Sequence, residues 1–292
     1  MQATVLTEIF LPLALGVIML GMGLSLTIED FKRLALFPKA TFVGLFCQLI
    51  LLPAVAFLIL KLIQLPPELA VGVMLLAFCP GGATSNLLSN LARADVALSI
   101  TLTAIASMIT VFTIPVLVNL SMEHFMGEGR FVQLPVVNTM AQIIVITIIP
   151  VSIGMIVRWR YQQFAQAAEK PVKIVSALFI ALVIAGVIYN ERENLAGYFV
   201  QVGLIMLLIN LVILAVAYTV SKLFRLSHPQ RSAVSIESGI QNGTLAIAIA
   251  SSSLLLNNSQ MSIPAAVYSL IMFATGGIAV YLFSRNWMFD KT

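Results

Sequence analysis

The chain has 292 residues, of which 60% are hydrophobic and only 10% are charged, and its mean hydropathy is +1.03. Because a soluble domain carries about 25% charged residues, this composition excludes a soluble globular protein and predicts an integral membrane protein. The net charge of +4 comes without a basic patch interleaved with aromatic residues, so no nucleic-acid partner is expected. Cys47 and Cys79 lie in apolar runs, which favours buried thiols over a disulfide framework or a metal site.

Apolar runs alternate with charged or turn-rich connections along the chain, which is the pattern of a helical membrane protein. The first run is kept as a helix rather than a signal peptide, because residues 1–8 contain no Lys or Arg. We therefore expect an all-α fold with nine transmembrane helices. Their predicted ranges are residues 9–26, 40–63, 69–92, 96–120, 136–157, 172–190, 198–222, 231–257 and 262–284.

The basic residues are divided unevenly between the two sides of this predicted topology. Of the 16, only Lys61, Arg130 and Arg192 fall on one side; the rest fall in the connections after helices 1, 3, 5 and 7 and in the C-terminal tail. Cytoplasmic loops of membrane proteins are enriched in Lys and Arg. The distribution predicts a multi-pass protein of the cell (inner) membrane, with its N-terminus outside and its C-terminus in the cytoplasm.

Two of the predicted helices contain breaks. The third has a proline, two glycines and three capping-type residues between Phe78 and Asn86. Proline lacks a backbone donor and glycine tolerates non-helical dihedral angles, so we expect this helix to unwind and to restart near Ala83 or Thr84. The eighth helix has a similar break at residues 239–244. For either break taken alone, a simple kink is the alternative.

The positions of the two breaks predict an inverted repeat. Each broken helix is followed by one further helix, so helices 1–4 can be laid over helices 6–9, with helix 5 between them. Equivalent helices are five apart and cross the membrane in opposite directions. Paired discontinuous helices that meet near the bilayer midplane are typical of secondary transporters.

Glu237 is the one acidic residue at membrane depth, since the other acidic residues sit in or beside predicted connections. An intramembrane carboxylate costs roughly 2.5–3.5 kcal/mol on insertion scales, so it marks a functional site. A single deep acid argues against an intramembrane aspartyl protease, and the loop positions of His124 and His228 argue against a Ser-His hydrolase or a histidine metal site. The chain also lacks a phosphate-binding loop motif, which leaves an ion gradient as the energy source.

The polarity of broken helices indicates what the breaks can bind. The first halves end in free carbonyls, which suit a cation, and the second halves begin with free amides and caps, which suit an anion. Sodium prefers oxygen ligands, and Ser99 and Thr103 share one helical face because they are four residues apart. Their alternative role is to bond back to the helix or to join helices. The other side-chain oxygens at membrane depth are those of Gln48, Ser85, Asn86, Glu237 and Gln241.

The run Cys79-Pro-Gly-Gly-Ala-Thr-Ser-Asn86, with Leu91-Ala-Arg93, Ala97-Leu-Ser99 and Glu237-x-Gly239-x-Gln241-Asn242, resembles the bile acid:sodium symporter family. The resemblance implies an inverted-repeat transporter in the nine-helix form, with a core domain that moves against a panel domain. Residues 1–292 would form one transporter unit. The core would come from residues 40–120 and 198–284, and the panel from residues 9–26 and 136–190.

The resemblance also implies two sodium sites that share Glu237. The first would consist of Ser85, Asn86, Ser99, Thr103 and Glu237. The second would consist of Gln48, Glu237, Gln241 and the carbonyls of Ser238 and Ile240. The substrate would lie against Thr84, Asn242, Gly243 and Thr244. The order Ala83-Thr84-Ser85 and the Gly243-Thr244 pair depart from the commonest family forms, which leaves the substrate open.

The expected function is therefore sodium-coupled symport of an organic anion by alternating access, with two sodium ions as coupling ions and no cofactor. Bile acids, sulfonates, pantoate and other small carboxylates all fit an anion site. The alternative is a proton-coupled transporter of the same fold, with Glu237 as the proton carrier. An intramembrane enzyme lacks a second acid, base or nucleophile, and a channel or receptor is the remaining alternative.

Overall fold

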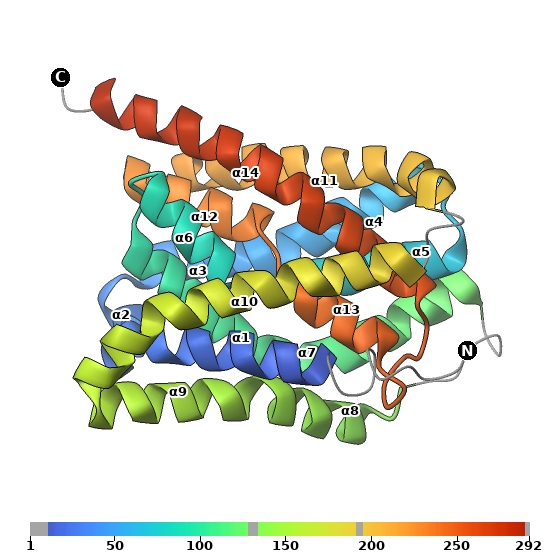
Figure 1. Ribbon diagram of the computed structural model, residues 1–292. Coiled ribbons are helices and arrows are strands. Elements are labelled where there is room, and N and C mark those ends of the chain that lie inside the picture. The colour runs from blue at the N-terminus through green and yellow to red at the C-terminus, as the bar shows by residue number, and fades with distance from the viewer. Residues whose placement is uncertain (1–10, 128–133, 191–194, 290–292) are drawn as a thin grey trace.

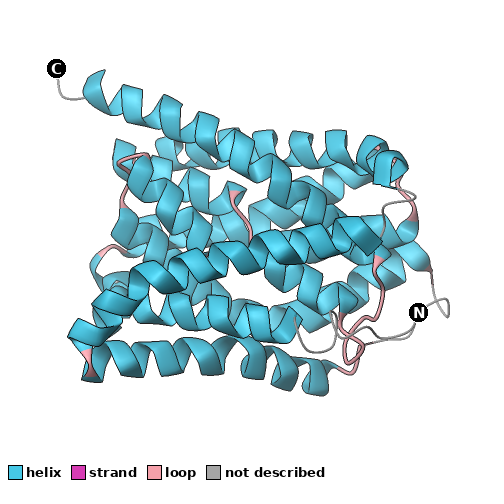
Figure 2. Cartoon of the chain, in the orientation of Figure 1, coloured by secondary structure: helices cyan, strands magenta, loops and turns pink. Residues whose placement is uncertain are grey.

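The computed structural model describes residues 11–127, 134–190 and 195–289, and within them the protein is a bundle of helices (Figures 1 and 2). In that part of the chain the only pairing of extended residues is an isolated antiparallel bridge between Gly81 and Gln241. The prediction of an all-α fold is confirmed. Arg130, Arg192 and Lys291, which entered the charge count, lie outside the described residues.

The helices follow one another closely along the chain. The first part contains α1 (Leu11–Ser25), α2 (Ile28–Leu36), α3 (Pro38–Phe46), the π-helical turn η2 (Cys47–Leu51), α4 (Leu52–Leu62), α5 (Pro67–Phe78), α6 (Ala83–Leu91) and α7 (Val96–Met126). The second part contains α8 (Val136–Ile143), the π-helical turn η3 (Ile144–Ile148), α9 (Ile149–Arg160), α10 (Gln162–Asn190), α11 (Leu195–Leu223), α12 (His228–Gly239), α13 (Gly243–Ser251), the 3-10 turn η4 (Gln260–Ser262) and α14 (Ile263–Phe289).

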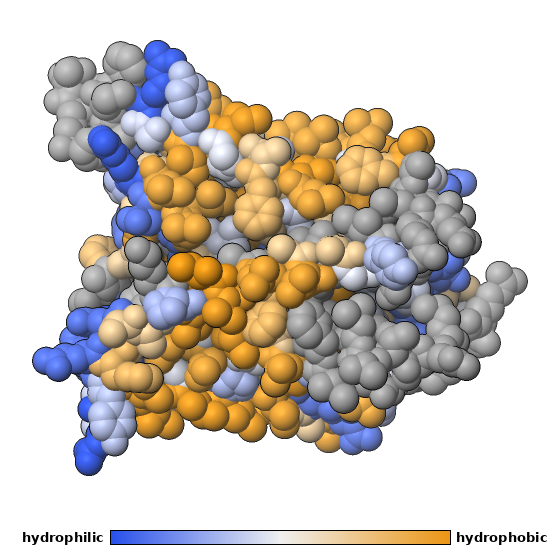
Figure 3. Space-filling view, viewed as in Figure 1, coloured by the Kyte–Doolittle hydropathy of each residue, from blue (hydrophilic) through white to orange (hydrophobic). Residues whose placement is uncertain are grey.

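The surface and the helix lengths are those of a membrane protein. Figure 3 shows apolar side chains over the middle of the visible face and hydrophilic residues gathered at the two ends of the bundle. Among the described residues, five stretches are long and apolar enough to cross a membrane: Pro38–Leu62, Val96–Met126, Val136–Arg160, Phe199–Leu223 and Gln260–Arg285. The protein is therefore a multi-pass membrane protein. The total of nine spans stays a prediction.

The broken helices are too short to cross a membrane singly. A spanning helix needs about 20 residues, whereas α5 and α12 have 12 residues each and α6 and α13 have 9 each. Each short helix can contribute to a crossing only together with the partner across its break.

Several boundaries differ from those predicted from hydrophobicity, among them the end of α7, at Met126 rather than near residue 120. Helix α2 occupies a segment predicted only as a connection, and α10 begins at Gln162 rather than near residue 172. The start of α10 is rich in Gln and Ala, which are good helix formers without an apolar periodicity. Helix α13 ends at Ser251 rather than near residue 257. Three consecutive serines begin there, and serine hydroxyls compete for the backbone groups of a helix.

Both π-helical turns lie just before a proline. Pro53 and Pro150 stand at the second positions of α4 and α9, directly after η2 and η3. Proline has no N–H and its ring crowds the preceding turn, and a π turn widens the helix at that point. The turn before Pro53 carries Gln48, whose side chain is fully buried. The widened turn thus places an amide group inside the bundle.

Helix α1 packs against α9 and α10, and its backbone touches that of α9 directly. A Cβ atom added at Gly23 would collide with the carbonyl of Val151.

We expect Gly23→Ala to destabilise the protein by about 1–3 kcal/mol, the usual cost of overpacking. Thermal unfolding in detergent would measure this. Gly277→Ala is the matched control, because no heavy atom lies within 4 Å of its added Cβ. Equal melting temperatures for the two variants would contradict the prediction.

The two predicted breaks are present and lie against each other. The chain leaves the helix between α5 and α6 at residues 79–82, and between α12 and α13 at residues 240–242. The backbone N–H of Asn242 donates to the carbonyl of Pro80 over 2.9 Å, next to the bridge between Gly81 and Gln241. Four short helices therefore end or begin around one point inside the bundle.

Candidate ion-binding site at the helix breaks

Glu237 lies in the last turn of α12, and its side chain is 0% exposed. Among the described residues it is the only buried side chain of the Asp, Glu, Lys and Arg types. Its two carboxylate oxygens accept hydrogen bonds from α7. Ser99 Oγ donates to Oε2 over 2.8 Å, and the Thr103 hydroxyl donates to Oε1. The carboxylate thus rests among neutral donors, without a buried Lys or Arg in the described part of the chain to balance its charge.

Around this carboxylate the oxygen acceptors outnumber the hydroxyl hydrogens. Asn86 Oδ1 lies 2.9 Å from Ser99 Oγ and 3.3 Å from Thr103 Oγ1, and Thr103 Oγ1 also lies 3.1 Å from the Ser99 carbonyl. Each hydroxyl has one hydrogen and can satisfy one acceptor at a time. A cation supplies the missing positive charge to several oxygens at once, which is the arrangement that a hard ion such as sodium requires.

Two buried glutamines add further unsatisfied oxygens. Gln48 has no hydrogen-bond partner for either its Oε1 or its Nε2, and the Oε1 of Gln241 has none either. Leaving a buried polar group unpaired costs about 1–3 kcal/mol. Gly81 lets these groups come together, since a Cβ there would collide with Glu237 Oε1 and lie 3.2 Å from Gln48 Nε2. Buried orphan oxygens beside a carboxylate fit a site for a cation.

The carbonyls at the end of α12 are divided between different partners. The Ser238 carbonyl accepts from Gln241 Nε2 over 2.8 Å. The Gly239 carbonyl accepts from Asn210 Nδ2 and from the Tyr268 hydroxyl, each over 2.8 Å. Asn210 and Tyr268 were not predicted from the sequence. The sequence could have indicated a buried polar role for Asn210, because it is the one polar residue within the apolar run of residues 203–217.

The predicted anion residues lie at the start of the second half-helices. Asn242 caps α13, and its Oδ1 accepts from the Leu245 N–H over 3.0 Å. Gly243 and Thr244 follow in the first turn and are buried, whereas Thr84, in the first turn of α6, is partly exposed. Gly243 is needed for close packing, since a Cβ there would collide with the Ser269 hydroxyl. The free amides of both first turns point toward the breaks, as helix geometry requires.

The structure brings most of the predicted ion ligands to one place. Asn86, Ser99, Thr103 and Glu237 are joined by hydrogen bonds, and Gln48 approaches them at Gly81. The Ser85 hydroxyl lies within hydrogen-bonding reach of the Glu237 carboxylate and also donates to the Gly82 carbonyl, over 2.7 Å. The carbonyl of Ser238 and the side chain of Gln241 are in contact with each other. Their assignment as sodium ligands stays a prediction.

A bundle that crosses the membrane several times, with a buried carboxylate among surplus oxygens at two helix breaks, defines a membrane transporter. The model of the sodium bile acid symporter family matches residues 12–198, more than half of the chain. The chain belongs to this family and is a transporter rather than an enzyme. The resemblance found in the sequence motifs is confirmed.

Relatives of the chain come from bacteria, plants and animals. The chain is 29% identical over 277 residues to the uncharacterized sodium-dependent transporter YocS of Bacillus subtilis, which covers 95% of this chain and 84% of the relative. It is 28% identical over 280 residues to a probable chloroplastic sodium/metabolite cotransporter, BASS2, of rice, and 29% identical over 244 residues to sodium/bile acid cotransporter 4 of Homo sapiens. The chain spans 64% of the rice protein and 55% of the human protein.

Proposed function

We propose that the protein couples the inward movement of sodium to the uptake of an organic anion. The observation that carries this proposal is the setting of Glu237, a buried carboxylate surrounded by more oxygen acceptors than hydrogens. Membership in the sodium bile acid symporter family supports sodium as the coupling ion. The names of the relatives, which refer to metabolites and bile acids, support an organic solute.

Two sodium ions would share Glu237. We assign the first to Ser85, Asn86, Ser99, Thr103 and Glu237. The contacts of Ser99 and Thr103 with both Asn86 Oδ1 and the Glu237 carboxylate support a common site. We assign the second to Gln48, Glu237, Gln241 and the carbonyls of Ser238 and Ile240. Gln241 Nε2 now bonds to the Ser238 carbonyl, so its amide has to turn for Oε1 to face an ion.

The position of the substrate site follows from the net charge of the site once both sodium ions are bound. Two sodium ions and one carboxylate carry a net charge of about +1, and the N-termini of α6 and α13 add partial positive charge. An organic anion beside Thr84, Asn242, Gly243 and Thr244 is then stabilised, and sodium binds before it. Alternating access exposes this region to each side of the membrane in turn.

The proposed architecture is a nine-helix inverted repeat in the inner membrane, with the N-terminus outside and the C-terminus cytoplasmic. Helices α5–α6 and α12–α13 form the two discontinuous crossings. In Figure 1, α1 and α14 both run from right to left along the bundle, which supports an odd number of crossings. The packing of α1 on α9 and α10 supports a panel from residues 9–26 and 136–190, opposite a core from residues 40–120 and 198–284.

The proposal is tested with purified protein in proteoliposomes and in detergent. Sodium is expected to raise the melting temperature, because a ligand that binds only the folded state stabilises it. Uptake of an organic anion that stabilises the protein only in the presence of sodium should require an inward sodium gradient. Replacing sodium with choline at fixed pH should stop the uptake. Uptake that continues in choline and follows a proton gradient would instead indicate the proton-coupled alternative.

A further inference from the structure

Three buried groups from three different helices form a closed hydrogen-bond triangle behind the second break. Asn210 of α11 donates through Nδ2 to the Gly239 carbonyl over 2.8 Å and to the Tyr268 hydroxyl over 2.9 Å. The Tyr268 hydroxyl of α14 donates to the same carbonyl over 2.8 Å. Asn210 is 0% exposed and Tyr268 is 1% exposed. We name Asn210, Tyr268 and the Gly239 carbonyl the Gly239 clamp.

The clamp decides which carbonyls of the break remain for an ion. With two strong donors already in contact, the Gly239 carbonyl has both lone pairs occupied. The next residue, Ile240, is extended, with φ −114° and ψ 98°. Carbonyls on either side of an extended residue point in opposite directions. Holding the Gly239 carbonyl toward α11 and α14 therefore turns the Ile240 carbonyl to the other side of the chain.

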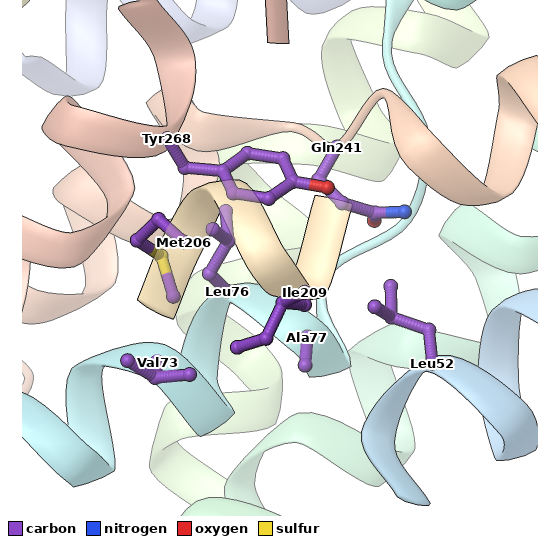
Figure 4. Close-up of a pocket in the computed structure, with 8 residues that line it drawn as sticks. All are labelled: Leu52, Val73, Leu76, Ala77, Met206, Ile209, Gln241 and Tyr268. Atoms are coloured by element: carbon purple, nitrogen blue, oxygen red, sulfur yellow. The ribbon is translucent and has the colours of Figure 1, made fainter. Parts of the chain in front are cut away.

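The break also needs to be held, because there is free space behind it. A cavity of about 10 Å³ is lined by Gln241, Tyr268 and apolar side chains of α4, α5 and α11 (Figure 4). Figure 4 shows the Tyr268 ring lying across this cavity, with its hydroxyl on the side of Gln241. This cavity is about the size of one water molecule, so the packing behind the unwound segment is incomplete and resists a small shift of the segment less than a filled core would. The clamp ties this segment to two continuous helices.

We propose that Asn210 and Tyr268 are positioning residues for sodium, which act through the Gly239 carbonyl and contact no ion themselves. They hold the backbone of residues 239–241 so that the Ile240 carbonyl faces the proposed second ion and the Gln241 amide can turn its Oε1 toward it. This inference rests on the proposed sodium symport. It extends that proposal to two residues outside both sets of sodium ligands.

The test uses Tyr268→Phe and Asn210→Leu in the full-length protein. The melting temperature is recorded against sodium concentration and, separately, against lithium concentration, with choline chloride to keep the ionic strength constant. Losing one net hydrogen bond corresponds to up to about tenfold in an equilibrium constant. Each variant should therefore need several-fold more sodium for half-maximal stabilisation and should discriminate less between sodium and lithium. The double variant should need more sodium than either single variant, because each single variant leaves one donor on the Gly239 carbonyl.

Tyr281→Phe is the matched control, since Tyr281 lies on the same helix and is 58% exposed. It should respond to sodium as the wild type does. If the clamp only stabilises the fold, the two clamp variants will melt lower without sodium but keep the wild-type half-saturating concentration and ion preference, which overturns the inference. If the wild type itself gains no stability from sodium, the proposed function fails, and the inference fails with it.

Discussion

A Glu237→Gln variant is expected to lose both sodium-driven uptake and stabilisation by sodium, yet to melt at a higher temperature than the wild type in sodium-free buffer. The carboxylate is fully buried and carries a charge that the described part of the chain does not balance with a buried Lys or Arg. The neutral amide keeps the shape of the side chain and removes the desolvation cost of the charge. Removing one member of a buried charge pair costs about 3–5 kcal/mol, so sodium affinity should fall more than a hundredfold.

Glu123→Gln provides the control for this variant, because Glu123 is an exposed carboxylate near the end of α7. It should keep the sodium response of the wild type. Thermal unfolding with and without sodium, together with uptake in proteoliposomes, measures both expected effects. A Glu237→Gln protein that still gains stability from sodium would show that the ion binds elsewhere.

The second large effect is expected at Gly81, where no side chain can fit. An added Cβ would collide with Glu237 Oε1 and approach Gln48 Nε2 to 3.2 Å. Gly81→Ala should therefore push the carboxylate away from Ser99 and Thr103 and weaken sodium binding about ten- to a hundredfold, the equivalent of about 1–3 kcal/mol of overpacking.

Gly82→Ala separates this local effect from a general effect of replacing a glycine in the break. The nearest atom to its added Cβ is 3.8 Å away, and its backbone, with φ −129° and ψ 178°, suits any residue. Its half-saturating sodium concentration should match that of the wild type. Equal sodium responses for the two alanine variants would mean that Gly81 does not shape the ion site.

The breaks and the buried acid could be predicted from the sequence because they depend on single residues with strong local effects. A proline followed by two glycines interrupts the helix after Cys79, and the predicted restart near Ala83 is where α6 begins. Single prolines at Pro115 and Pro171 stay inside α7 and α10. Glu237 stood out because a carboxylate inside an apolar segment is costly in any membrane fold. Both inferences need no knowledge of which helices are neighbours.

The contact between the two breaks and the Gly239 clamp could not be predicted, because they depend on contacts between segments far apart in the chain. The bond between Asn242 and Pro80, and the clamp that Asn210 and Tyr268 place on Gly239, join helices whose adjacency no local pattern encodes. Helix α2 was missed for another reason, since it is rich in charged residues and too short to appear as an apolar run. Neighbouring helices are chosen by packing, which a hydrophobicity pattern does not specify.

The hydrogen bond between the two breaks places the proposed ion ligands and the proposed solute ligands next to each other. Gln241, proposed to face sodium, and Asn242, proposed to face the anion, are consecutive residues, and Asn242 is tied to Pro80 of the other break. A rotation of the peptide between them changes both positions at once. The free energy of coupling between ion and solute can therefore be transmitted through a single peptide unit, and it needs no extended chain of side chains across the bundle.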